Sequence, residues 1–154
     1  MSLSEILSNS SNLYALFIGT FLGSSFLPAA GLPILTLCVL NRTDFEAIFF
    51  ISTLGNWLGA VLTYVLGLSF PLKWLEKVFR VNEQKLERAS LWFKKYNVYA
   101  AIGSGIPVVG DRVSLVLGIF RTPALNTILL MLVGKALRYA ILIPLIYYGT
   151  RGSL

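Results

Sequence analysis

The sequence predicts an all-α integral membrane protein: an inverted repeat of two re-entrant helical hairpins, each followed by a transmembrane helix, with amphipathic helices between the repeats. Three observations predict this fold. Of the 154 residues, 56% are apolar and 13% are charged, and the mean hydropathy of +0.74 lies outside the range of soluble domains. Two of the four long apolar stretches are interrupted by proline and glycine. The chain also aligns with itself, without a gap, at a shift of 79 positions.

The residue composition argues against most enzyme chemistry. The chain has one cysteine, Cys38, and no histidine, so it lacks an internal disulfide, the usual metal ligand and the usual general base near neutral pH. It contains no phosphate-binding loop, nucleotide fingerprint or pair of catalytic carboxylates. We therefore expect no enzymatic activity, no cofactor and no metal site. The net charge of +6 is expected to mark cytoplasmic loops, and nucleic acid is not the expected partner.

The first apolar stretch, Leu13 to Leu40, is broken by LPAAGLP at Leu27–Pro33. As helices, its two parts would reach roughly 22 Å and roughly 10 Å, whereas the hydrocarbon core is about 30 Å thick. We therefore expect a hairpin that enters the membrane and returns to the same face, with Pro28, Gly31 and Pro33 at its tip. The alternative is one spanning helix with a proline kink. Because non-helical backbone at membrane depth needs a protein or wet environment, the re-entrant interpretation predicts a cavity.

Two stretches are long enough to cross the bilayer as single helices. Phe45 to Leu68 and Ala124 to Tyr148 each run for about 24 or 25 residues without a central proline. The first contains GNWLG, a small-xxx-small pattern that favours close helix packing. The predicted packing positions in the two helices are Gly55, Asn56, Gly59 and Gly134.

The segment between the two halves, Pro71 to Tyr96, carries seven of the thirteen basic residues. The positive-inside rule therefore places it in the cytoplasm. Apolar residues at helical spacing in 72–79 and an N-cap at Asn82 predict two amphipathic helices on the inner membrane surface. These helices either bind anionic lipid headgroups or form a solvated basic connector.

The third apolar stretch, Val98 to Phe120, is broken at Gly105–Asp111 and predicts a second hairpin, with Pro107 and Gly110 at its tip. The alternative is again one spanning helix with a proline kink.

The self-alignment relates the two hairpins and the helices that follow them. It divides the single membrane domain, residues 1–154, into repeat one (about 13–69), the connector (about 71–96) and repeat two (about 97–149). One crossing per repeat makes the two units inverted, so the tips are expected to meet near the midplane, with both termini outside. The aligned pairs are Pro28 and Pro107, Gly31 and Gly110, Arg42 and Arg121, Thr43 and Thr122, Gly55 and Gly134, and Leu58 and Leu137.

Four charged residues lie deep in the predicted second repeat. Lys135 and Arg138 are one turn apart near the middle of the last span and share a face. A charge at the bilayer centre costs at least about 2.5 to 3.5 kcal/mol, so such residues usually face a cavity or a partner. With Asp111 and Arg112 at the second tip, three cations and one anion leave a surplus of +2. We expect these four residues to form the substrate site: Lys135 and Arg138 bind an anionic headgroup together with free backbone amides, and Asp111 and Arg112 gate or balance charge at the second tip. Alternatively, Asp111 forms a structural bridge to Lys135 or Arg138, and Arg112 snorkels to the interface.

Three segments resemble the DedA superfamily, whose domain is also called VTT or SNARE-associated. They are GNWLGAVLTYVLG followed by FPLKW, WFKKYNVYAAIGSGIPVVGDRVSLVLG, and GKALRYA, in the same order and at similar spacing. The chain is most similar to the small YqaA-like bacterial branch. The resemblance covers most of the chain and implies two oppositely facing re-entrant hairpins, a bacterial or archaeal cytoplasmic membrane, and the movement of lipids. Several bacterial members are implicated in recycling undecaprenyl phosphate, and eukaryotic relatives in phospholipid scrambling.

The chain departs from that family's pattern at both tips. Leu32 and Pro33 stand where members generally carry an acid, and Gly105 and Gly110 stand where the larger branch carries arginines. Asp111 is therefore the best candidate for a titrating group within the membrane.

We therefore expect a transporter of the DedA type that translocates an anionic lipid, either a polyprenyl phosphate or a phospholipid, through a cavity between the hairpins. The alternatives are a proton-coupled transporter of ions or small solutes that uses Asp111, and a non-transporting membrane assembly factor. Two hairpins and two spans form only a thin shell around a cavity, which leaves a homodimer open.

Overall fold

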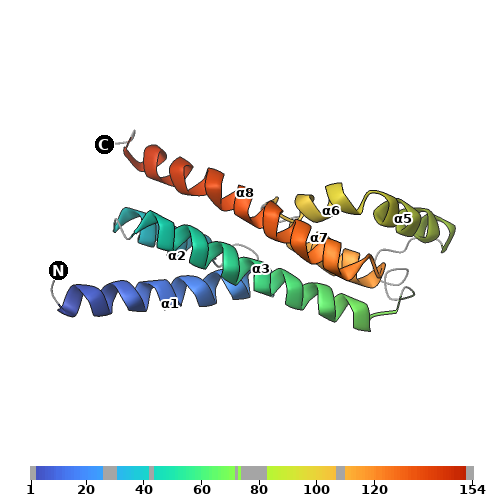
Figure 1. Cartoon of the computed structure of the whole chain (residues 1–154), viewed down its shortest axis with the longest axis horizontal. Helices are drawn as coiled ribbons and strands as arrows, with labels where there is room; N and C mark the ends of the chain where they lie inside the picture. Colours follow the sequence, from blue (N-terminus) through green and yellow to red (C-terminus); the bar gives the residue numbers. More distant parts are fainter. Residues whose placement is uncertain are drawn as a thin grey trace.

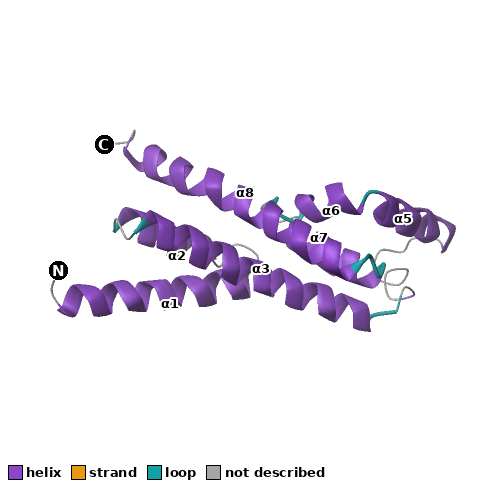
Figure 2. Ribbon diagram, viewed as in Figure 1, coloured by secondary structure: helices purple, strands orange, loops and turns teal. Residues whose placement is uncertain are grey.

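The computed structural model describes residues 3–25, 31–41, 44–71, 73, 83–106 and 110–151. Within these ranges every regular element is a helix (Figure 2), which confirms the predicted all-α class for this part of the chain. Pro28, Pro107 and most of the first predicted connector helix lie outside the described residues. In chain order the helices are α1 (Leu3–Ser25), α2 (Gly31–Leu40), α3 (Phe45–Ser69), α5 (Glu83–Lys95), α6 (Asn97–Gly103), α7 (Gly110–Ile119) and α8 (Ala124–Arg151).

Two helices, α3 and α8, are long and apolar enough to cross a membrane by length and composition. Helix α3 begins after Asp44, whose carboxylate accepts a hydrogen bond from the backbone N–H of Glu46 at 3.2 Å and so caps the helix. Helix α8 continues through Pro144 to Arg151, beyond the predicted end at Tyr148. A helix can continue past a proline because the local loss of one hydrogen bond is absorbed by bending. Both predicted spans are therefore helices of spanning length.

Helices α1 and α2 lie side by side and run in opposite directions. The Cys38 Sγ lies 3.7 Å from the carbonyl oxygen of Asn12. At the other end of the pair, a Cβ added to Gly31 would lie only 3.1 Å from the Cα of Thr20. The chain therefore reverses direction between these helices, and a side chain at position 31 would press against the backbone of α1.

The boundaries of this pair differ from the prediction at two places. Helix α1 begins at Leu3 rather than near Leu13, although its apolar part is limited to Asn12–Ser24. Helix α2 begins at Gly31, and Pro33 therefore lies in its first turn instead of in the break. Proline is tolerated there because the first N–H groups of a helix have no intrahelical acceptor.

Helices α6 and α7 form the corresponding pair in the second half. Gly110, the first residue of α7, lies directly against the backbone of Ser104, just after α6. The rings of Phe93 and Phe120 are 5.1 Å apart, which brings the end of α7 back to α5. Gly110 and Asp111 belong to α7 and not to the break in which the sequence places them.

Helix α3 contacts α1, α2, α7 and α8 and is the centre of the bundle. It runs antiparallel to α8: the rings of Phe45 and Tyr147 are 5.2 Å apart at one end, and the Tyr64 hydroxyl donates to the Thr122 carbonyl oxygen at 2.6 Å near the other. Both chain ends lie at one end of the long axis, and α5 lies at the opposite end (Figure 1).

The bundle buries polar groups beside its apolar core and exposes many large apolar side chains. Asn56 and Lys135 are buried, together with several serines and threonines. On α8 an apolar side chain is exposed at every fourth position: Leu125, Leu129, Val133, Leu137, Ile141 and Leu145. Such a surface is unfavourable in water but matches a hydrocarbon solvent, in which helices associate through small and polar residues.

Two buried clusters contain residues that the self-alignment relates. One cluster joins α1, α2, α3 and α8, and the other joins α3, α6, α7 and α8. Gly55 lies against α1 in the first half, as Gly134 lies against α6 in the second. In each related pair, one residue belongs to the first cluster and its counterpart, 79 positions away, belongs to the second. These pairs are Cys38 and Leu117, Tyr139 and Ala60, and Ile143 and Tyr64.

Candidate anion-binding site in the helix bundle

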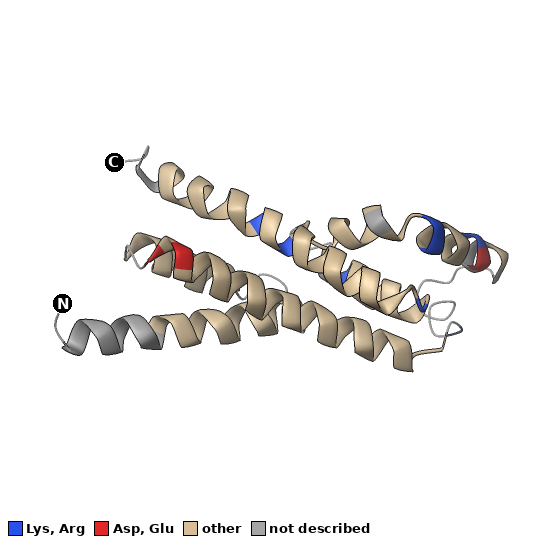
Figure 3. Ribbon diagram, viewed as in Figure 1, with Lys and Arg blue, Asp and Glu red and all other residues tan. Residues whose placement is uncertain are grey.

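Two cations lie midway along α8, away from the charged ends of the bundle (Figure 3). The first of them, Lys135, is 0% exposed, and its Nζ donates to the Ser24 Oγ at 3.3 Å. Ser24 is next to the last residue of α1, so the ammonium lies at the negative end of that helix dipole. Lys135 therefore joins α8 to the C-terminal end of α1.

Arg138, the second cation, has different surroundings although it is only one turn away. It is partly buried, and its Nε and Nη1 have no hydrogen-bond partner among the residues that the structure describes. Its Cζ lies 5.7 Å from the ring centroid of Tyr139, within the range of a cation–π interaction. Because a guanidinium donates from a planar fork that matches two oxygens at once, this group is suited to bind a phosphate or carboxylate.

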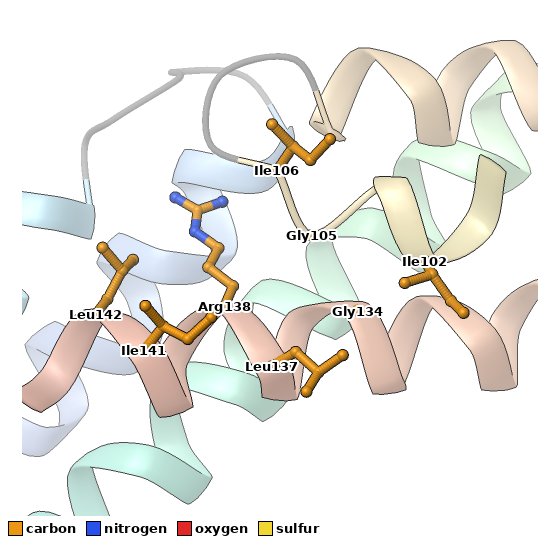
Figure 4. A pocket seen from close by; sticks show the side chains of 8 residues that line it. All are labelled: Ile102, Gly105, Ile106, Gly134, Leu137, Arg138, Ile141 and Leu142. Atoms are coloured by element: carbon orange, nitrogen blue, oxygen red, sulfur yellow. The ribbon is translucent and has the colours of Figure 1, made fainter. Parts of the chain in front are cut away.

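Arg138 lines an apolar cavity of about 290 Å³ beside α8. In Figure 4 its side chain extends from the helix toward the side on which Ile106 lies, whereas Leu137 points away. Among the described residues that line this cavity, Arg138 is the one charged side chain. The others are Ile102, Gly105, Ile106, Gly134, Leu137, Ile141 and Leu142. The cavity therefore combines hydrocarbon walls with a single cation.

A second cavity, of about 10 Å³, lies among α1, α2, α3 and α8 and is also lined by Arg138. The first residues of α2, Gly31 and Leu32, line it, and N–H groups in the first turn of a helix have no intrahelical acceptor. The N-terminal residues of that helix therefore line the same space as Arg138. The remaining lining residues are Thr20, Gly23, Asn56 and Tyr139.

The other predicted site residues are distributed around these cavities. Arg112 is exposed on α7, and the side chain of Asp111 lies outside the described residues. Lys135 lines neither cavity. Gly31 lines the small cavity, whereas Pro33 is exposed on α2.

The structure thus brings together three residues for which the sequence predicts separate roles. Arg138 is the predicted substrate ligand, Gly31 a predicted tip residue and Asn56 a predicted packing residue, and all three line the small cavity.

Sequence reasoning missed two polar residues at this site, Thr20 and Tyr139. Each lies in an apolar stretch, and Tyr139 directly follows Arg138, so a search for polar groups in the spans would have found both. The apolar lining residues carry no such signal, because they resemble every lipid-facing residue in the chain.

A model of the VTT domain matches residues 24–148, from the end of α1 to the last turns of α8. The chain belongs to the VTT domain family. The resemblance to the DedA superfamily and to its YqaA-like branch is thereby confirmed. No solved structure matches the chain significantly.

The similar proteins come from bacteria and an archaeon. The inner membrane protein YqaA of Escherichia coli is 31% identical over 86% of this chain and 89% of its own length. An uncharacterised protein of Haemophilus influenzae is also 31% identical, over 86% of this chain and 85% of its own length. An uncharacterised protein of Methanocaldococcus jannaschii is 26% identical over 68% of this chain and 65% of its own length. Together with the apolar exterior, these relatives identify the VTT-family chain as an integral membrane protein.

Proposed function

We propose that this VTT-family protein is a transporter that moves an anionic lipid, a polyprenyl phosphate or a phospholipid, across the cytoplasmic membrane. The observation that carries the proposal is the guanidinium of Arg138. It lies midway along a helix of spanning length, at the wall of an apolar cavity, and two of its nitrogens have no partner among the described residues. Placing a charge at that depth costs about 2.5 to 3.5 kcal/mol or more, so an anion that shares the site would offset the cost.

The larger cavity supports a ligand with two chemically different parts. Its walls are almost wholly apolar and suit a hydrocarbon chain. Arg138, the one charged side chain among the described residues that line it, suits an anionic headgroup. The head of the lipid would therefore be bound by Arg138, with its tail along Ile106 and Ile141.

The pairing of the helices supports two re-entrant hairpins arranged as inverted repeats. In each half, two successive helices reverse the chain, and the following long helix packs against the first of them through a glycine, Gly55 or Gly134. The long helices α3 and α8 run antiparallel. The proposed repeats thus face opposite sides, and a lipid would reach the central cations from either side.

The other charged residues would assist Arg138 from different places. Lys135 would hold the end of α1 and add positive charge from behind the site, because it is buried against Ser24. Arg112 and Asp111, in the first turn of α7, would balance or gate charge at the second tip. A homodimer is compatible with the apolar exterior and stays part of the proposal.

A lipid-flux assay tests the role of Arg138 directly. Vesicles that contain the protein and a trace of fluorescent anionic lipid are treated with an impermeant quencher, once with a labelled polyprenyl phosphate and once with a labelled phosphatidylglycerol. Arg138→Met retains the apolar stem but removes the charge, so we expect flux to fall at least about tenfold, which corresponds to 1.4 kcal/mol of lost interaction. Lost flux with unchanged folding supports the proposal, and undiminished flux removes Arg138 from the mechanism.

Arg121→Asn is the matched control, because it also removes one arginine charge. Arg121 is exposed in the turn after α7 and has a φ of 50°, a conformation that asparagine tolerates. Flux should stay at the wild-type level in this variant. If no lipid moves but solute-dependent proton movement is lost in Asp111→Asn, the protein is a proton-coupled solute transporter. If neither is observed, the assembly-factor hypothesis is favoured.

A further inference from the structure

The small cavity contains unpartnered polar groups of complementary kinds. Asn56 is 3% exposed, and its Oδ1, an acceptor, has no hydrogen-bond partner among the described residues. The Nε and Nη1 of Arg138, which are donors, are likewise buried without a partner in that part of the chain. Both side chains line the same cavity. An unsatisfied buried polar group costs about 1 to 3 kcal/mol, so three of them around one space point to something that joins them.

The size and chemistry of this space suit a single water molecule. Its volume of about 10 Å³ is about the minimum that holds one water. A water can accept from the guanidinium of Arg138 and donate to the Oδ1 of Asn56, which satisfies both residues at once. A bare anion fits less well, because its charge would face the amide oxygen of Asn56.

A second contact links the same two residues through Tyr139. The Nδ2 of Asn56 donates to the Tyr139 hydroxyl at 2.7 Å, and the ring of Tyr139 lies beneath the guanidinium of Arg138. Asn56 comes from α3 and the other two residues from α8. Asn56 therefore reaches Arg138 by two routes, one through the cavity and one through the tyrosine ring.

We propose that Asn56 is a positioning residue for Arg138: it holds one water molecule in the small cavity and the ring of Tyr139 under the guanidinium. Because an amide is neutral, Asn56 orients the guanidinium without neutralising it, and the charge stays available to an anion in the larger cavity. A carboxylate at the same place would orient Arg138 equally well but would take up its charge. The effect on lipid binding rests on the proposed function, whereas the coupling of Asn56 to Arg138 does not.

The substitution Asn56→Asp tests this assignment, because it changes the charge of the side chain and almost nothing of its shape. Thermal unfolding is measured in detergent micelles for four proteins: wild type, Asn56→Asp, Arg138→Met and the double variant. We expect Asn56→Asp to raise the melting temperature in the wild-type background, where the new carboxylate pairs with Arg138. In the Arg138→Met background the same change should lower it, because the buried carboxylate then has no cation. An equal shift in both backgrounds would overturn the proposal.

Asn97→Asp is the matched control, because Asn97 is also buried, with 7% of its surface exposed. Asn97 lies in the second half of the bundle, where its Oδ1 accepts a hydrogen bond from Thr127. It should lower the melting temperature by the same amount with and without Arg138. A dependence of the Asn97→Asp shift on Arg138 would mean that the Asn56 result reflects a general charge effect, and would overturn the assignment.

Binding of dodecyl phosphate, a single-chain anionic amphiphile, provides the second readout. Asn56→Asp should weaken its affinity at least about tenfold per folded protein, a change of 1.4 kcal/mol, and Arg138→Met should weaken it by a similar factor. If Asn56→Asp binds like the wild type while Arg138→Met does not, Asn56 has no positioning role. If neither substitution affects binding but the thermal coupling persists, the coupling of Asn56 to Arg138 stands and the proposed lipid site fails.

Discussion

Lys135 and Arg138 share a face of one helix, and yet tertiary contacts separate their roles. The ammonium of Lys135 is enclosed and donates to Ser24, whereas Arg138 lines two cavities. Both residues lie in α8, and their three-residue spacing puts them on a common face of that helix. The spacing does not predict which neighbour each long side chain meets, because α1 and α2 come from the distant first half of the chain.

At the residue scale, Lys135 is expected to contribute mainly to stability. Lys135→Ala removes a 0% exposed side chain and should lower the free energy of unfolding by about 2 to 5 kcal/mol, the usual cost of a large cavity. Lys135→Met restores most of the volume without the charge and should recover most of this loss. Chemical denaturation in micelles measures both. An equal loss in the two variants would show that the charge, and not the packing, matters at this position.

At the element scale, glycines set the distances between helices. Gly134 lies against Ile102 at the end of α6, and Gly105 in turn lies against the backbone of Gly134. A Cβ added to Gly134 would be 3.1 Å from the Cα of Ile102 and would also meet its carbonyl oxygen. Because the obstacle is backbone, it cannot rotate away, and the whole of α6 would have to move.

Gly134→Ala is therefore expected to destabilise the protein by about 1 to 3 kcal/mol, the range found for overpacked cores. Gly149→Ala on the same helix is the comparison, because a Cβ there would meet nothing within 4 Å. It should be neutral or should stabilise α8 by up to about 1 kcal/mol through helix propensity. Thermal unfolding of the two variants in micelles measures the difference. Equal melting temperatures would mean that α6 is not held against α8 in the membrane.

At the scale of the whole molecule, the proposed inverted repeats predict which loops share a side of the membrane. Cys38 and Val39, near the end of α2, pack with Tyr147 at the same end of the bundle as the C-terminus. Phe120, at the end of α7, contacts Phe93 of α5 at the opposite end. The residues that follow α2 and α7 therefore lie at opposite ends of the long axis.

Labelling with an impermeant maleimide tests this arrangement in a Cys38→Ser background. Asn41→Cys and Arg121→Cys place single thiols at exposed positions after α2 and after α7. We expect Asn41→Cys to react from the outer side and Arg121→Cys from the cytoplasmic side, together with Leu91→Cys on the basic helix α5. Reaction of the first two from the same side would contradict the inverted arrangement.

The sequence by itself determined that the protein lies in a membrane and that it has two long apolar helices. Both follow from composition, because a long apolar run is suited to crossing a bilayer. The prediction failed at helix ends, since α1 extends back to Leu3 and α2 already begins at Gly31. Backbone hydrogen bonds extend a helix through polar residues as well as apolar ones. The end of an apolar stretch therefore does not mark the end of the helix.

Only the tertiary structure decided how the polar groups meet. Asn56 and Tyr139 are 83 residues apart in the chain and are nevertheless joined by a hydrogen bond, while Arg138 contributes to two cavities formed by different helices. A cavity is the space left when several helices pack against one another, so its position depends on every close contact in the bundle. No local pattern contains that information, and for this reason the sequence predicted the cation but not its surroundings.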